Sequence, residues 1–297
     1  MHECSYSQLN VRIFREAARL IIDGAKRYKA VTGREKMMSD EENWYRKSDI
    51  SSTFLKGLKV LSAFDDATPR LTLAEIGKRT GLDRAAVRRL VITLLDFGYV
   101  EKTGKTFSLT PKILTLSGSY MRGNGVGVVV QPILNRYSEE MAAEISLAGV
   151  AETEAVYIAK SILPGSNISF GFTVGSRLSL LQTAIGRMLL ASRDDGFVAD
   201  LIKTGNLREY TRDSIMDRAR IRQEIETARR QGFAIVTNEF EAGITGLAVP
   251  VGSPMTAKTV IGISAPVAVL QVDENRARYL SVLQQCANDL DRTQLES

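Results

Sequence analysis

Residues 71–109 constrain the fold more than any other part of this 297-residue chain. Thr72 and Glu75 have the spacing of a capping box, in which the Thr hydroxyl accepts from the Glu backbone N–H and the Glu carboxylate accepts from the Thr backbone N–H. Gly81 follows at a position where a helix end favours the left-handed conformation. Asp83 then suits the N-cap of a second helix, where a carboxylate also meets the positive end of the helix dipole. The stretch therefore predicts two short helices joined by a tight turn.

The second of these helices has two different faces. The apolar residues that recur at helical spacing, and that we expect to face inward, are Val87, Leu90, Val91, Leu94 and Leu95. The residues on or beside the opposite face, in the first two turns, are Arg84, Ala85, Arg88 and Arg89. The first turns of a recognition helix are the ones that meet base edges in a DNA groove. The small Ala85 and Ala86 permit a close approach to such a groove.

Two short strands are expected after the second helix, at residues 99–100 and 107–109. Between them Lys102 and Lys105 flank a Gly-containing turn, which predicts a wing that contacts phosphates. The order of cap, turn, basic face and wing is typical of a winged helix-turn-helix that binds double-stranded DNA. The alternative is a helical pair used for protein packing, with solvated arginines.

Charge is distributed unevenly along the chain, whose formal net charge is +5. Residues 51–118 contain 11 Lys and Arg against 6 Asp and Glu, whereas residues 119–297 contain 18 against 20. A basic module joined to a nearly neutral one fits a DNA reader with a separate sensor. A chance fluctuation of this size is the competing explanation.

Several classes of protein are disfavoured by what the sequence lacks. Cys4 and Cys286 are the only cysteines, so neither a disulfide framework nor a zinc finger is expected, and a reducing cytoplasm is the natural setting. The single histidine is His2, which disfavours Ser-His-Asp, Cys-His and histidine-metal chemistry. No convincing lysine or carboxylate constellation replaces it. We therefore expect no enzyme, no cofactor and no metal, and no apolar run reaches the ~20 residues needed to span a bilayer.

Residues 1–50 form an N-terminal extension with two interpretations. Residues 11–22 are amphipathic at helical spacing and lack the cleavage pattern of a secretory signal. They could form a helical arm that packs on a partner subunit. The interpretation that we favour is that native translation begins at Met37 or Met38.

The rest of the chain divides into an α+β arrangement of two domains. We expect a DNA-binding domain at 51–110 that opens with a helix at 54–64, a linker helix within 111–131 that ends at Gly-rich breaks, and a second domain at 132–297. In the second domain, the expected helices are 133–143, 183–191, 215–231 and 273–290. The expected strands are 145–150, 155–159, 168–174, 233–236, 247–251 and 260–264.

At this point the sequence resembles the IclR-type transcriptional regulators over residues 51–290. The ordered motifs that carry the resemblance are residues 73–82, 94–100, 174–178, 183–187, 232–234 and 241–251. Residues 84–89 and 107–111 look most like the branch that controls aromatic-acid catabolism. The resemblance implies a dimer or tetramer, a GAF-like C-terminal effector-binding domain and a small organic acid as effector.

The resemblance also assigns an effector pocket to particular residues. They are Thr183, Ala184, Ile185, Gly186, Asn238, Glu239, Gly246 and Ser264. Many relatives have an acidic residue where Asn238 stands and Cys or Ser where Gly246 stands, so the pocket here is less acidic and has less polar reach. Physically, a helix beginning at residues 183–186 would favour a carboxylate through its free N–H groups and dipole. The alternative is that Ala184 and Gly186 are small for helix–sheet packing.

These observations lead to a hypothesis of a ligand-responsive DNA-binding regulator of a catabolic operon. Two subunits would place their basic helices on a pseudo-palindromic operator, and effector binding would shift the relative placement of the two heads. Arg177 could bind the ligand, although a structural ion pair is the favoured role. The rival hypotheses are a small-acid enzyme with a helical appendage and an interaction module that does not bind DNA.

Overall fold

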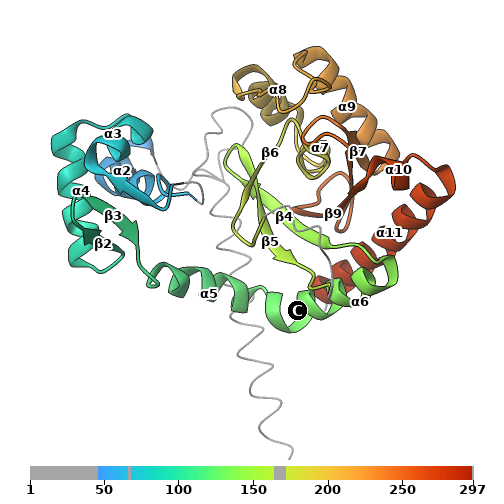
Figure 1. Cartoon of the computed structure of the whole chain (residues 1–297), viewed down its shortest axis with the longest axis horizontal. Helices are drawn as coiled ribbons and strands as arrows, with labels where there is room; N and C mark the ends of the chain where they lie inside the picture. The colour runs from blue at the N-terminus through green and yellow to red at the C-terminus, as the bar shows by residue number, and fades with distance from the viewer. Residues whose placement is uncertain (1–45, 66–67, 164–171, 296–297) are drawn as a thin grey trace, which may run out of the picture. The chain divides into compact units, whose positions relative to one another are not determined.

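The computed structural model describes residues 46–65, 68–163 and 172–295 of the chain (Figure 1). The chain separates into two compact units whose boundary lies between Asn124 and Gly125, and each unit is described by itself. The expectations for residues 1–45, including the amphipathic segment, lie outside the described residues. The first described element is a short 3-10 helix, η2 (Lys47–Asp49).

The N-terminal unit is a winged helix-turn-helix, as the sequence predicts. Its elements in chain order are α2 (Ser52–Leu61), β1 (Arg70–Thr72), α3 (Leu73–Thr80), α4 (Arg84–Asp96), β2 (Val100–Thr103), β3 (Thr106–Leu109) and α5 (Ile113–Gly123). The three strands form an antiparallel sheet in the order β1-β3-β2. Strand β1 has no counterpart in the sequence prediction, because three residues are too few for an alternating pattern to stand out.

The helix boundaries of the motif form as predicted. Both hydrogen bonds of the capping box join Thr72 and Glu75, and Gly81 ends α3 in the left-handed conformation at φ 69°. Asp83 caps α4, its side chain accepting from the backbone N–H of Ala86 at 2.8 Å. These local hydrogen bonds satisfy backbone groups that a helix end leaves unpaired, which explains why they could be recognised in the sequence.

Fewer apolar residues are buried in the core of this unit than the sequence predicts. Ile76, Val87 and Val91 are fully buried, but Leu95 is 37 % exposed and Phe54 of α2 is 67 % exposed. The expectation that Leu95 faces inward is therefore wrong, and Phe54 of the first helix does not join the core either. A small unit covers only a narrow stripe of each helix, so apolar residues at the edge of that stripe stay exposed.

The connection between the units is helical on both sides of the boundary. Helix α5 ends within the predicted linker region 111–131, and Gly125 then adopts φ +61° ahead of a π-helical turn, η3 (Val126–Val130). Helix α6 (Gln131–Met141) follows at once, two residues earlier than predicted. Pro132 lies in its first turn, where proline is common.

The C-terminal unit contains a six-stranded antiparallel sheet in the order β6-β5-β4-β9-β8-β7. Its strands are β4 (Ile145–Ala151), β5 (Glu154–Lys160), β6 (Arg177–Ser179), β7 (Ala234–Thr237), β8 (Ile244–Pro250) and β9 (Thr259–Pro266). The hairpin and the last three strands were predicted. The first part of the strand predicted at 168–174 lies outside the described residues. Its described end, from Phe172, is not a strand.

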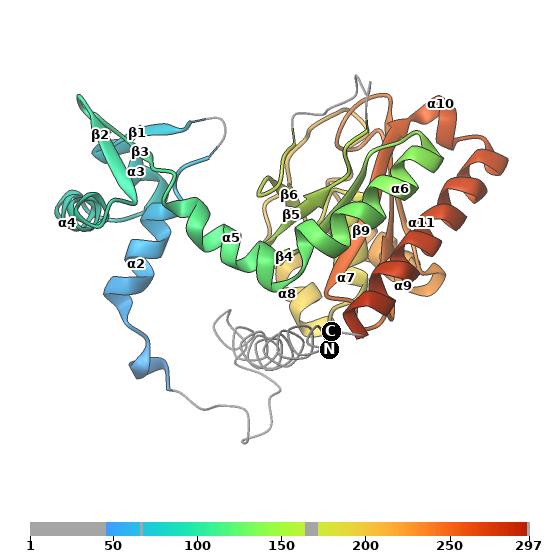
Figure 2. The same cartoon turned by 90° about the horizontal axis from the view of Figure 1, so that it is seen from below.

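Helices cover both faces of this sheet (Figures 1 and 2). Helix α7 (Ala184–Ala191) packs on one face, with α8 (Asp195–Thr204) and α9 (Arg218–Gln231) behind it. Helices α6 and α11 (Asp273–Leu295) lie side by side over the other face, and the short α10 (Val267–Leu270) precedes α11. Asp217 caps α9, so this helix begins later than the predicted 215. Helix α11 begins at the predicted residue, Asp273, and ends five residues beyond the predicted 290.

No helix in the described part of the chain is both long and apolar enough to cross a membrane.

Removing the Thr72 hydroxyl is expected to destabilise the N-terminal unit. Thr72→Ala deletes the acceptor for the Glu75 backbone N–H, so the free energy of unfolding should fall by about 1 kcal/mol. Thr72→Ser keeps the hydroxyl and should stay close to wild type. Urea unfolding of the full chain, followed by circular dichroism, measures both, and equal stability of the two variants would contradict this account of the cap.

Candidate functional site

The first two turns of α4 present a basic face to solvent. Arg84, Ala85, Arg88 and Arg89 are all exposed. None of the three arginines forms an ion pair with another described residue. The hydrogen bond from the backbone of Ala86 lowers the pKa of Asp83, so the capping carboxylate stays ionised. The geometry therefore leaves the guanidinium groups available to an anionic partner.

The wing adds two further exposed cations. Lys102 lies in β2 and not in the turn where the sequence prediction placed it, whereas Lys105 lies in the turn itself. Gly104 occupies the left-handed region at φ +61°, which the tight turn between β2 and β3 requires. Both lysines project from a short hairpin, a position that suits contact with phosphates.

Other basic residues of the unit are used to hold the fold. Arg79 donates to the backbone carbonyl of Ala63 at 2.8 Å and pairs with Asp65 at 2.7 Å. Lys112 donates to the carbonyl of Phe97 at 2.5 Å and lies 4.7 Å from the centre of the Tyr99 ring. The basic residues therefore divide into a packing group and an exposed group, and the exposed group is the one predicted to contact DNA.

A cavity of about 340 Å³ opens in the C-terminal unit between the sheet and the start of α7. One wall is apolar and largely aromatic, and the side chains that form it are Tyr157, Phe172, Leu178, Ile185 and Phe240. The Tyr157 and Phe172 rings meet edge to face with centroids 6.0 Å apart, and Phe172 lies equally far from Phe240. Burial raises the pKa of Tyr157 to about 12, so its hydroxyl stays protonated.

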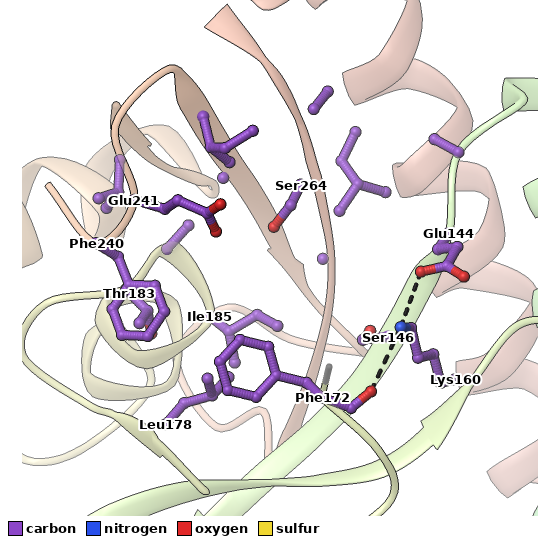
Figure 3. A pocket seen from close by; sticks show the side chains of 18 of the residues that line it. Glu144, Ser146, Lys160, Phe172, Leu178, Thr183, Ile185, Phe240, Glu241 and Ser264 are labelled. Atoms are coloured by element: carbon purple, nitrogen blue, oxygen red, sulfur yellow. Dashed lines mark hydrogen bonds and ion pairs between the residues drawn. The ribbon is translucent and has the colours of Figure 1, made fainter. Parts of the chain in front are cut away.

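Polar groups face this wall from two sides of the space (Figure 3). On one side, the Lys160 ammonium pairs with Glu144 at 2.8 Å and lies 3.4 Å from the carbonyl oxygen of Phe172. On the other side lie the side chains of Glu241 and Ser264. Ser264 is exposed although it belongs to β9, an inner strand of the sheet, because it faces the hollow. An apolar cavity with a few convergent polar groups is the usual form of a small-molecule site.

Five of the residues assigned to an effector pocket line this cavity: Thr183, Ala184, Ile185, Gly246 and Ser264. Thr183 caps α7, its hydroxyl accepting from the Gly186 N–H at 3.0 Å and donating to the Ser179 carbonyl at 2.8 Å. Gly246 stands opposite Ser264 in the sheet. A Cβ at Gly246 would lie 3.1 Å from that of Ala184, so glycine keeps this side of the cavity open.

The other three assigned residues, Gly186, Asn238 and Glu239, do not line the cavity. A Cβ on Gly186 would lie 2.3 Å from the Ser179 carbonyl oxygen, so this glycine permits close packing of α7. Asn238 adopts φ 60° and accepts from the Gly243 N–H at 2.8 Å, which closes the loop between β7 and β8.

The Glu239 carboxylate forms a buried ion pair with Arg187 of α7. The guanidinium is 1 % exposed and donates to the two carboxylate oxygens at 2.8 and 2.6 Å, in the bidentate geometry of a strong pair. Its Nε also donates to the Leu181 carbonyl at 2.9 Å. The pair fixes α7 to the loop whose next residues, Phe240 and Glu241, face the cavity. Glu239 therefore holds the cavity-lining residues in position without lining the cavity itself.

Arg177 has the structural role that the sequence analysis favoured. It lies outside the cavity lining and pairs with Glu154 across strands β5 and β6 at 3.3 Å.

Several cavity residues have no counterpart in the sequence analysis, among them Glu144, Lys160, Phe240 and Glu241. Phe240 and Glu241 directly follow Asn238 and Glu239, so the cavity is lined by the same segment two residues further along the chain. For Glu144 and Lys160 the available signal was the predicted hairpin: its pairing brings Lys160 opposite Ser146. Recognising it would have required the strand register.

Breaking the buried pair is expected to destabilise the C-terminal unit strongly. Arg187→Met leaves the Glu239 carboxylate buried without its cation, and the free energy of unfolding should fall by about 3–5 kcal/mol. Arg187→Met combined with Glu239→Leu removes both charges and should recover much of that loss. Arg177→Met, which breaks the half-exposed pair with Glu154, is the matched control and should cost less than about 1 kcal/mol. Urea unfolding of the full-length variants measures all three; similar losses for Arg187→Met and Arg177→Met would contradict the assignment.

Comparison with known proteins gives a consistent result for both units. The family described as "IclR helix-turn-helix domain" matches residues 54–104, and the family described as "Bacterial transcriptional regulator IclR C-terminal" matches residues 119–292. The Pca regulon regulatory protein of Pseudomonas putida is 31% identical over 275 residues, which cover 91% of this chain and 89% of that protein. The p-hydroxybenzoate hydroxylase transcriptional activator of Acinetobacter baylyi is 30% identical over 210 residues, covering 69% and 78%.

Solved structures agree on the fold. A putative IclR transcriptional regulator from Silicibacter superposes with a TM-score of 0.74 at 22% identity, covering 82% of this chain and 96% of that one. An IclR homolog from Microbacterium hydrocarbonoxydans, solved in complex with 4-hydroxybenzoate, superposes with a TM-score of 0.67 at 20% identity, covering 83% and 100%. With both family matches in chain order and more than half of the sequence covered, the chain belongs to the IclR family of bacterial transcriptional regulators.

Proposed function

We propose that this chain is a ligand-responsive DNA-binding regulator of a catabolic operon and that it senses a small aromatic carboxylic acid. The observation that carries the proposal is the cavity beside α7, which combines a wall of aromatic rings with a few polar groups. The names of its relatives support the choice of ligand, since they regulate the Pca regulon or p-hydroxybenzoate hydroxylase. An IclR homolog of the same fold was solved with 4-hydroxybenzoate.

The residues that line the cavity suit a single substituted benzene ring. The rings of Tyr157, Phe172 and Phe240 can pack edge to face or offset against it, an arrangement worth about 0.5–1.5 kcal/mol per aromatic pair beyond area burial. Thr183, Ala184 and Ile185 bring the N-terminal end of α7 to the cavity, where the helix dipole favours a negative charge. Ser264 and Gly246 complete the side formed by the sheet. Gly186, Asn238 and Glu239 hold these parts in place.

The basic face of α4 is proposed to lie in a major groove of operator DNA. Arg84, Ala85, Arg88 and Arg89 would approach the base edges, and Lys102 and Lys105 of the wing would contact phosphates. The regulator would act as a homo-oligomer, a dimer or a tetramer, so that two recognition helices read a pseudo-palindromic site. Effector binding would change DNA affinity through its preference for one arrangement of the heads, with a coupling of typically ~1–3 kcal/mol.

Substitutions in α4 and in the wing should change DNA binding in different ways. Arg88→Ala should weaken binding to the cognate operator by about 1–3 kcal/mol and bring it closer to binding of a scrambled duplex. Lys102→Ala should weaken binding to both duplexes and lower the salt dependence by about one counterion. Lys203→Met, at an exposed residue of α8 in the other unit, is the control and should leave binding to both duplexes unchanged.

These affinities are measured by fluorescence anisotropy at several salt concentrations, on labelled DNA from the region upstream of the protein's own gene. Arg88→Ala that binds the operator as tightly as wild type would rule out that residue as a base contact. If no fragment is bound more tightly than the scrambled duplex, this region is rejected as the operator, and the failure of a wider operator search would favour an interaction module that does not bind DNA.

The ligand class is tested by comparing acids of equal charge and different shape. At a concentration 100-fold above its Kd, 4-hydroxybenzoate or protocatechuate should stabilise the protein by about 2.7 kcal/mol. Pyruvate at the same concentration should stabilise it far less, because it binds more weakly. Phe240→Ala removes part of the aromatic wall and should reduce the difference between the two classes. Thermal unfolding with each acid measures the effect. Chromatography of the incubated acid then separates a sensor, which leaves it unchanged, from the rival small-acid enzyme.

A further inference from the structure

The charged groups of the cavity are few, and its carboxylates outnumber its cations. Among its described lining residues, Glu144 and Glu241 are the carboxylates and Lys160 is the one cation. Lys160 and Glu144 form their ion pair with side chains 18 % and 19 % exposed, so neither is fully solvated. A carboxylate effector entering this space meets two like charges, which makes the placement of Lys160 decisive for whether an anion can bind.

The main chain of Lys160 is fixed on two sides. It ends β5 opposite Ser146 of β4, and its carbonyl accepts from the Gln131 side chain of α6 at 2.8 Å. The ammonium is thereby brought to the cavity edge, close to the carbonyl of Phe172, whose ring belongs to the apolar wall (Figure 3). A cation held beside an aromatic wall has the arrangement that a benzoate-type ligand requires.

The ammonium also has spare hydrogen-bonding capacity. A lysine ammonium carries three donors. The Lys160 Nζ lies 2.8 Å from a carboxylate oxygen of Glu144 and, at the longer distance of 3.4 Å, from the carbonyl oxygen of Phe172. These contacts use at most two of the donors. The remaining donor can therefore reach a ligand carboxylate without breaking the pair with Glu144. The two carboxylates would then share one cation.

We propose that Lys160 anchors the effector carboxylate and that Glu144 is an internal counter-charge that competes with it. This assignment rests on the proposed function, because it names the residue that would recognise the acid group. The aromatic ring then lies along the Phe172 wall. Its far end points toward Glu241 and Ser264, which can accept hydrogen bonds from a phenolic hydroxyl (Figure 3). The competing placement puts the carboxylate at the start of α7, with no direct contact to Lys160.

The test compares an acid with its neutral counterpart of the same shape. Isothermal titration of the full-length wild type with 4-hydroxybenzoate and 4-hydroxybenzamide should show tighter binding of the acid. Lys160→Met should weaken acid binding by about 10- to 100-fold, the cost of a lost charge-assisted hydrogen bond, while amide binding changes little. Glu144→Gln removes the competitor and should strengthen acid binding by about threefold. Lys203→Met is the matched lysine control.

The double variant Glu144→Gln/Lys160→Met separates anchoring from simple neutralisation. If Lys160 contacts the ligand, acid binding stays weak in the double variant. Recovery to the wild-type affinity would mean that Lys160 only neutralises Glu144, and would overturn the proposal. If Lys160→Met does not fold, Glu144→Gln decides: an increased acid-over-amide ratio supports the competition, and an unchanged ratio contradicts it.

The outcomes also distinguish this inference from the proposed function. A wild type that prefers the acid, together with a Lys160→Met variant that binds it equally well, would overturn the anchor and leave the aromatic-acid sensor intact. A wild type that binds neither compound would overturn both.

Discussion

The close approach of α7 to the sheet is the constraint on which the C-terminal unit depends. A Cβ on Gly186 would lie 2.3 Å from the Ser179 carbonyl oxygen, and one on Gly262 would lie 2.8 Å from Ile185, so only glycine permits this separation. Interiors packed at crystal-like density cannot absorb such overlaps. The buried pair between Arg187 and Glu239 then locks the helix to the loop before β8. The helix start is held firmly, which is what a binding site requires.

The cavity follows from this arrangement. Helix α7 covers part of one sheet face, and Ser264 on an inner strand remains exposed where the helix does not reach. Gly246 keeps the space open from the sheet side, whereas Phe172 and Phe240 bound it with aromatic rings. The polar groups enter from separate elements, so the sheet and α7 together define a small volume with distinct apolar and charged ends.

The accuracy of the sequence predictions depended on how local their signals are. The capping box of Thr72 and the cap at Asp83 are contacts within one helical turn, and both formed as predicted. Leu95 was misassigned because helical spacing shows which residues share a face but not how wide a stripe the neighbours cover. Among the cavity residues, Thr183 was assigned through the family resemblance at a predicted helix start, whereas Glu144, just before β4, and Lys160, at the end of β5, come together only through strand pairing.

The sequence by itself determined the winged helix-turn-helix, the α+β character of the second unit and the separation of a basic module from a nearly neutral one. Each of these is encoded in residues at fixed short spacings, where backbone hydrogen bonds and periodic burial act within a single element. Only the tertiary structure decided that Glu239 faces Arg187 inside the protein and that Lys160 faces the cavity. Strand register and helix–sheet packing set those contacts, and both depend on residues far apart in the chain.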